Sequence, residues 1–297
     1  LFGISRYLTV PLAGLIIGLV ILRGNYKSVE KILLVLCLSA FSYVITVFVI
    51  KPDWGIILKD ALTPTIELGA EYLLAVLAVI GTTITPWGIF YLQASVADKG
   101  TDIKDYKHTR IDVVFGSVWG NIISAFIIIT TAATLFPKGI LVNSAEEAAM
   151  ALSPLAGSFS SLLFAIGMLG ASLLAVSVLP LSTTYAMCEA FGFERGLNRP
   201  VKDAPVFYSI FISIMLISML FVLIPGIPLF QIMLISQSVN AILLPVILIL
   251  VLVLANDKNI MGKWVNNRFS NYLGYALTGI IFLATIALLV GEFLPAA

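Results

Sequence analysis

The chain has 297 residues, of which 60% are hydrophobic and 11% are charged, whereas an average globular domain has about 25% charged residues. Its formal net charge is +1, and no basic cluster with interleaved aromatic residues occurs, so the sequence gives no support for binding to nucleic acid. The two cysteines, Cys37 and Cys188, both lie in apolar runs, which excludes a disulfide framework and a zinc-ligand spacing. This composition predicts an integral, multi-pass protein of the lipid bilayer.

Eight apolar runs are long enough, or nearly long enough, to cross a bilayer as helices. This pattern predicts an all-α, polytopic fold in which residues 1–297 form a single transmembrane domain. The first run is the shortest, and it is distinguished from a signal sequence because Arg23 and Lys27 follow it in place of a polar cleavage region. The predicted spans are about 7–22, 32–50, 72–97, 113–136, 160–187, 206–224, 230–254 and 273–290.

The third span contains a polar break at 81–88, which reads GTTITPWG in one-letter code. Pro86 cannot donate a backbone hydrogen bond to the carbonyl of Thr82, four residues earlier. Inside a bilayer, irregular backbone is tolerated only where it is buried in protein or lines a wet cavity. The break therefore predicts an unwound functional site, although a simple proline kink repaired by neighbouring helices is the alternative.

A polar connection lies between the fourth and fifth spans. In this connection Ser144 and Glu147 have the spacing of a capping box, and an apolar stretch follows them as far as Leu152. We expect a short surface helix there.

The basic residues predict the orientation of the chain, because lysine and arginine concentrate in cytoplasmic loops. The odd-numbered connections between spans hold 13 of the 17 basic residues. These connections are therefore predicted to be cytoplasmic, and both chain ends to face outward. The 13 residues are Arg23, Lys27, Lys31, Lys99, Lys104, Lys107, Arg110, Arg195, Arg199, Lys202, Lys258, Lys263 and Arg268.

Uncharged amides are the main polar side chains inside the later spans. Gln237 and Asn240 lie three residues apart and share a helix face, and Asn121 lies in the fourth span. Such amides most often hydrogen-bond to a neighbouring helix, but they can also bind a ligand. Both interpretations remain open for these three residues.

The titratable residues give no support for an enzyme. Glu189 and Asp112 lie at the ends of spans, where a carboxylate can reach water, and His108 lies in a basic loop. No Ser-His-Asp set, carboxylate dyad, HExxH motif or phosphate-binding loop occurs in the sequence.

Two stretches resemble the Nramp family of divalent metal transporters. The break after Ile80 resembles the sixth helix of that family, where an unwound Met-Pro-His-Asn segment binds the ion. The stretch 235–245, which reads ISQSVNAILLP, and the residues 256–262 after it are similar to the tenth-helix region. The resemblance covers nearly the whole chain. It implies a LeuT-type fold with two inverted repeats, of which this chain holds the fourth to eleventh helices and lacks the first three.

The resemblance also assigns metal-binding positions. The family's metal-binding carbonyl corresponds to Thr82, its methionine to Thr85, and a tenth-helix glutamine to Gln237. The residues after Pro86 depart from the family pattern, because tryptophan and glycine replace histidine and asparagine. This departure resembles the magnesium-transporting branch of the family. The residues implied to support the site or line the pathway are Gly81, Pro86, Gly88, Asn240 and Asn121.

The implied function is transport of a divalent metal cation across the cell membrane by alternating access. Hydroxyl and carbonyl oxygens suit hard cations, so Mg²⁺ is the first expected substrate and Mn²⁺ the second, with no cofactor besides the transported ion. Because no predicted span contains histidine, we expect transport that is not coupled to protons. The alternatives are an organic-substrate symporter of the same fold and a non-transporting membrane fragment.

The predicted orientation can be tested by cysteine labelling. A cysteine placed in the loop 99–110 should react with an impermeant thiol reagent only from the cytoplasmic side, and one placed in 138–158 only from the outer side. Labelling of both loops from the same side would contradict the predicted topology.

Overall fold

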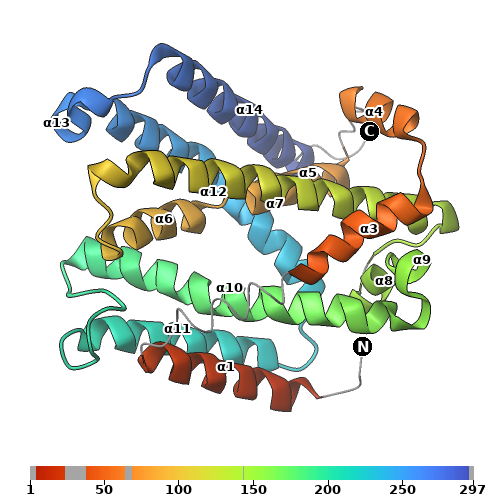
Figure 1. Ribbon diagram of the computed structural model, residues 1–297, viewed down its shortest axis with the longest axis horizontal. Coiled ribbons are helices and arrows are strands. Elements are labelled where there is room, and N and C mark those ends of the chain that lie inside the picture. The colour runs from red at the N-terminus through yellow and green to blue at the C-terminus, as the bar shows by residue number, and fades with distance from the viewer. Residues whose placement is uncertain (1–4, 24–37, 64–68, 143, 294–297) are drawn as a thin grey trace. The chain divides into compact units, whose positions relative to one another are not determined.

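A computed structural model describes residues 5–23, 38–63, 69–142 and 144–293, and the secondary structure of these residues consists of helices and connecting turns (Figure 1). The α-helices are α1 (Arg6–Leu22), α3 (Phe41–Ile50), α4 (Trp54–Leu62), α5 (Ala70–Thr83), α6 (Pro86–Asp98), α7 (Tyr106–Thr134), α8 (Ala145–Met150), α9 (Ser153–Ala156), α10 (Ser160–Phe191), α11 (Pro205–Leu223), α12 (Leu229–Asn256), α13 (Lys258–Met261) and α14 (Arg268–Phe293). The protein is thus all-α and polytopic, as the sequence predicts.

Six segments of the described chain are long and apolar enough to cross a membrane, and they correspond to the six predicted spans from 72–97 onward. The predicted span 7–22 is α1, whose 17 residues rise only about 26 Å. The predicted span 32–50 lies partly outside the described residues. Its described part, Leu38–Ile50, is followed by α4 after a bend of 118°, so the two helices together form either a broken span or a re-entrant segment.

The bend between α3 and α4 has a local cause. Lys51 adopts a left-handed conformation with φ 51° and ends α3, which only a minority of residues other than glycine do. Asp53 then begins α4, because its side chain accepts hydrogen bonds from the backbone N–H groups of Gly55 and Ile56. This helix is not among the elements predicted from the sequence.

The surface helix predicted after Ser144 is present as α8. Its first turn is capped by Ser144, whose hydroxyl accepts a hydrogen bond of 3.2 Å from the backbone N–H of Glu147. This bond satisfies one of the four N–H groups that a helix start leaves without an intrahelical partner.

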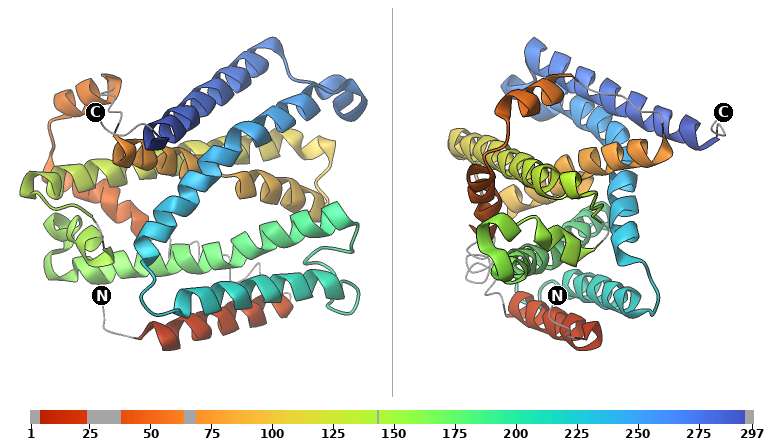
Figure 2. Two further views of the ribbon diagram at one scale, coloured as in Figure 1. Left: turned by 180° about the vertical axis from the view of Figure 1, so that it is seen from behind. Right: turned by 90° about the vertical axis from the view of Figure 1, so that its right-hand side faces the viewer.

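The chain divides into two compact units. The first unit consists of Leu1–Thr63 and Phe90–Ile227, and in it α11 packs against both α1 and α10 (Figure 2). Its main core contains the fully buried side chains of Phe207 and Phe211. In the same unit α3 packs against α7, and the Thr130 hydroxyl donates a buried hydrogen bond of 3.0 Å to the backbone carbonyl of Tyr43.

The second unit consists of Pro64–Ile89 and Pro228–Ala297. In this unit α12 packs against α5 and α14, and α14 also packs against α5. The core lies where Leu73 and Leu77 of α5 contact Ala241 of α12. The small side chain of Ala241 allows α5 to lie close to α12, which brings the broken span against the helix that carries Gln237.

Candidate functional site

The predicted break is present between α5 and α6, and it is narrower than the segment 81–88 predicted from the sequence. Only Ile84 and Thr85 lie outside the two helices. The last hydrogen bond of α5 joins the N–H of Ile84 to the carbonyl of Ile80 at 3.0 Å, and the bonding resumes where the N–H of Gly88 donates to the carbonyl of Thr85 at 3.1 Å. The break is short because proline is well tolerated in the first turn of a helix, so α6 begins directly at Pro86.

The three threonines at the break have different positions. Thr82 lies in the last turn of α5. Pro86, four residues later, has no backbone N–H to donate to the carbonyl of Thr82. The hydroxyl of Thr83 donates a 2.7 Å hydrogen bond to the carbonyl of Val79 in its own helix. Thr85 immediately precedes α6, and a β-carbon added at Gly88 would lie 2.7 Å from its Oγ1 atom. The hydroxyl of Thr85 therefore lies against the first turn of α6, which is the position of a capping residue.

Gly81 is in direct backbone contact with α12. A β-carbon added at Gly81 would lie 1.9 Å from the carbonyl oxygen of Gln237 and 2.9 Å from the backbone nitrogen of Ala241. No side chain can be accommodated there without separating the two helices. Glycine is thus required at this position for close approach, and the contact places Gln237 beside the last turn of α5, next to Thr82.

The amide of Gln237 is oriented by its neighbour in α12. Asn240 Nδ2 donates a 3.1 Å hydrogen bond to Gln237 Oε1, which fixes the position of an oxygen that is a suitable ligand for a hard cation. Ser238 also connects the two helices, because its hydroxyl lies 3.3 Å from the carbonyl of Leu74 in α5. The second unit therefore brings together Gly81, Gln237 and Asn240 of the predicted residues, and Thr82 follows Gly81 directly in the chain.

Asn121 is not among the residues that this unit brings together. It belongs to α7 in the first unit, and its side-chain amide donates a 2.8 Å hydrogen bond to the carbonyl of Ser117 in its own helix. Among the described residues, no group of three or more histidine, cysteine, aspartate or glutamate side chains is close enough to hold a metal ion. The oxygen donors at the break in the described chain are therefore carbonyls, hydroxyls and an amide.

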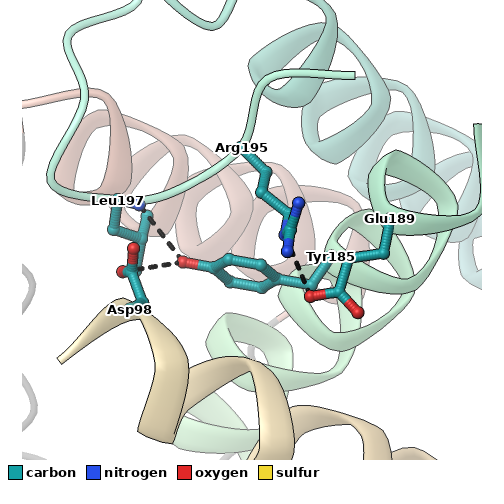
Figure 3. A network of polar contacts seen from close by, with 5 residues as sticks. All are labelled: Asp98, Tyr185, Glu189, Arg195 and Leu197. Atoms are coloured by element: carbon teal, nitrogen blue, oxygen red, sulfur yellow. Dashed lines mark hydrogen bonds and ion pairs between the residues drawn. The ribbon is translucent and has the colours of Figure 1, made fainter. Parts of the chain in front are cut away.

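The first unit contains a polar network that was not predicted from the sequence (Figure 3). It links Asp98, the last residue of α6, to Tyr185 of α10 and to the backbone of Leu197 in the loop between α10 and α11. The sequence offered one weak signal, which is a carboxylate at the end of the third predicted span. Its partner is 87 residues away in the sequence, and no local pattern predicts such a pair.

Residues 1–291 match the profile of the Nramp family, which is described as natural resistance-associated macrophage protein-like. Three similar curated proteins are each called divalent metal cation transporter MntH. The relative from Clostridium acetobutylicum is 28% identical over 261 residues, which cover 86% of this chain and 57% of the relative. The relative from Caldanaerobacter subterraneus is 25% identical over 292 residues, with coverages of 95% and 66%. The relative from Bacillus subtilis is 25% identical over 279 residues, with coverages of 91% and 63%. The chain thus spans about three fifths of the length of these relatives.

The close contact at Gly81 predicts that adding one methyl group at this position destabilises the protein. Gly81→Ala should lower the free energy of unfolding by about 1–3 kcal/mol, because overpacking forces the backbones of α5 and α12 apart. Thermal unfolding of the purified protein in detergent measures this loss.

Gly120→Ala is the matched control, since a β-carbon at Gly120 in α7 meets no atom within 4 Å. This change should be neutral or should stabilise the protein by up to about 1 kcal/mol, because alanine favours the helix. Equal unfolding temperatures for Gly81→Ala and Gly120→Ala would contradict the proposed close contact.

Proposed function

The chain belongs to the Nramp family, and on that premise we propose that it moves a divalent metal cation across a cell membrane. The single observation that carries this proposal is the break between α5 and α6, where Pro86 cannot donate to the carbonyl of Thr82 and the preceding residue, Gly81, lies against Gln237 of α12. The similar proteins named as divalent metal cation transporters support the same assignment.

The donor atoms at the break favour a hard cation. The candidate ligands are the carbonyl oxygen of Thr82, the hydroxyl of Thr85 and the side-chain oxygen of Gln237. Oxygen ligands suit Mg²⁺ and Mn²⁺, whereas the thioether and imidazole ligands that favour softer metals are absent from the described stretch 81–88. We therefore propose Mg²⁺ as the first substrate and Mn²⁺ as the second.

The geometry of the helix ends supports a cation on the α5 side of the break. The C-terminal end of a helix carries a partial negative charge of about half an elementary charge, and α5 has 14 residues whose dipoles add toward Thr83. Discontinuous helices of this kind bind coupling ions and substrates in other transporters. The uncharged ligands also suit Mg²⁺ that keeps several of its waters, because Mg²⁺ gives up its hydration shell reluctantly.

The proposed transport proceeds by alternating access and without proton coupling. Histidine is the side chain that titrates near neutral pH without a large perturbation, and His108 lies in the exposed first turn of α7 rather than at the break. The described residues of 72–97 contain no carboxylate or imidazole that could take up a proton beside the ion.

The proposal is tested by metal uptake into proteoliposomes that contain the purified protein and a fluorescent indicator for Mg²⁺ or Mn²⁺. Saturable uptake with no change in internal pH is expected. Internal acidification that follows metal uptake would contradict the absence of proton coupling. Saturable uptake of an amino acid with no uptake of either ion would instead favour an organic-substrate symporter.

Thr85→Met tests whether Thr85 binds the ion. If its hydroxyl is a ligand, methionine introduces a soft sulfur atom, and the binding preference should shift toward Cd²⁺ and Mn²⁺ relative to Mg²⁺ by about tenfold or less. Competition binding with the three ions measures the preference order.

The capping position of Thr85 against Gly88 gives a distinct outcome. If Thr85 only begins α6, Thr85→Met should weaken all three ions equally, whereas Thr85→Ser should keep both the cap and the affinity. An unchanged preference order with uniformly weaker binding would remove Thr85 from the proposed ligands and leave the Thr82 carbonyl and Gln237.

A further inference from the structure

We propose that Asp98 and Tyr185 form a latch that holds the C-terminal end of α6 against α10 and the loop that follows it. The latch consists of Asp98, Tyr185, Leu197 and Asn198, all of which lie in the first unit. Figure 3 shows the first three of these residues. This inference does not depend on which ion is transported, because it concerns the anchoring of a helix.

Tyr185 is the centre of the latch. Its hydroxyl donates a 3.0 Å hydrogen bond to Asp98 Oδ2 and accepts a 3.1 Å hydrogen bond from the backbone N–H of Leu197. The side chain is only 4% exposed, and its ring packs edge-on against Phe207 at a centroid distance of 4.9 Å. A buried hydroxyl that bonds to a carboxylate makes a stronger bond than one between neutral groups, so a single atom joins three segments of the chain.

The loop is shaped to meet Asp98. Asn198 Nδ2 donates a 3.1 Å hydrogen bond to the backbone carbonyl of Asp98, which is one of the carbonyls left without an intrahelical partner at the end of α6. Gly196 has φ +124°, and a β-carbon there would lie 2.7 Å from Asp98 Oδ1. Both the carboxylate and the backbone end of α6 are therefore in contact with this loop.

Other polar contacts hold the loop itself in place. Arg195 Nε lies 2.9 Å from Glu189 Oε1, as an ion pair whose geometry is not that of an aligned hydrogen bond. Arg199 pairs with Glu194 at 2.5 Å, and the buried Tyr208 hydroxyl donates a 2.8 Å hydrogen bond to the carbonyl of Arg199. These contacts make the loop a fixed surface on which α6 can be held.

A polar cavity of about 330 Å³ lies beside the latch. It is lined by Ala94, Asp98 and Tyr185 together with Glu194, Arg195 and Arg199 of the loop. A cavity of this size and polarity can hold water, and water can replace the tyrosine hydroxyl as a partner of the carboxylate. When the latch opens, water in the cavity can therefore solvate the Asp98 carboxylate. In a contact that excludes water, the same opening would leave the carboxylate buried without a partner.

The latch has a specific consequence for α6. The helix begins at Pro86 after a break that removes its hydrogen bonds to α5, so its position is not fixed by continuity with that helix. Ala94 packs in the core with Tyr185, and Asp98 lies one turn later on the same face. We therefore infer that the latch decides whether this face of α6 stays packed against α10 or separates from it.

The test is a reporter cysteine at Ala94, which is 2% exposed, in the full chain carrying Cys37→Ser and Cys188→Ser. The measured quantity is the rate of reaction with N-ethylmaleimide in detergent-purified protein. Tyr185→Phe removes only the hydroxyl and should raise this rate about fivefold, because a lost buried hydrogen bond favours the locally open state by about that factor.

Two controls separate the latch from general loosening of the fold. Thr130→Val removes a buried hydrogen bond between α7 and α3 in the same unit and leaves the latch and its loop unchanged, so the reporter should react at the unchanged rate. Asp98→Asn retains an oxygen that can accept from Tyr185 and should label slowly, whereas Asp98→Ala should label as fast as Tyr185→Phe. Unchanged labelling in both Tyr185→Phe and Asp98→Ala would overturn the proposal, and so would an equal increase in Thr130→Val.

Discussion

The contact between Gly81 and the carbonyl of Gln237 is the constraint on which the proposed site depends. Because a β-carbon at Gly81 would lie 1.9 Å from that oxygen, the backbones of α5 and α12 meet with no side chain between them. This contact fixes the end of α5 directly before the break. Pro86 has no backbone N–H to donate to the carbonyl of Thr82, so this carbonyl loses its usual helical partner one residue after the contact with α12.

The two ends of α6, the helix that follows the break, are held by different contacts. Its first turn is shaped by Thr85, whose hydroxyl lies against Gly88, and its last residue, Asp98, is held by Tyr185 and Asn198. A helix that is broken from its predecessor loses the positional control of continuous hydrogen bonding. The hydrogen bonds at Asp98 fix the position of α6 instead, and water can replace these bonds. This combination is suited to a segment that is ordered in each of two arrangements.

The sequence predicts the features that depend on local patterns. Apolar runs locate the six spans, Pro86 locates the break, and the three-residue spacing of Gln237 and Asn240 places them on one face, where the structure has them hydrogen-bonded. The structure has a narrower break than the predicted segment 81–88, because α5 continues through Gly81 to Thr83. The residue types at 81–83 do not reveal that these residues keep their helical hydrogen bonds. The pairing of Asp98 with Tyr185 could not be predicted, because it joins segments 87 residues apart. The bend at Lys51 was missed because it depends on a left-handed conformation at a residue that is not glycine.

The central claim is that the ion binds where the break in α5 and α6 meets α12. The most direct measurement is the equilibrium affinity of the purified protein for Mn²⁺, read from the free-ion signal by electron paramagnetic resonance. Gln237→Leu removes the amide oxygen and should weaken binding by about tenfold or more, since loss of even an indirect metal contact has an effect of that size. Gln231→Leu, an exposed position in the first turn of the same helix, should leave the affinity unchanged. Equal affinities for the wild type, Gln237→Leu and Gln231→Leu would contradict the account.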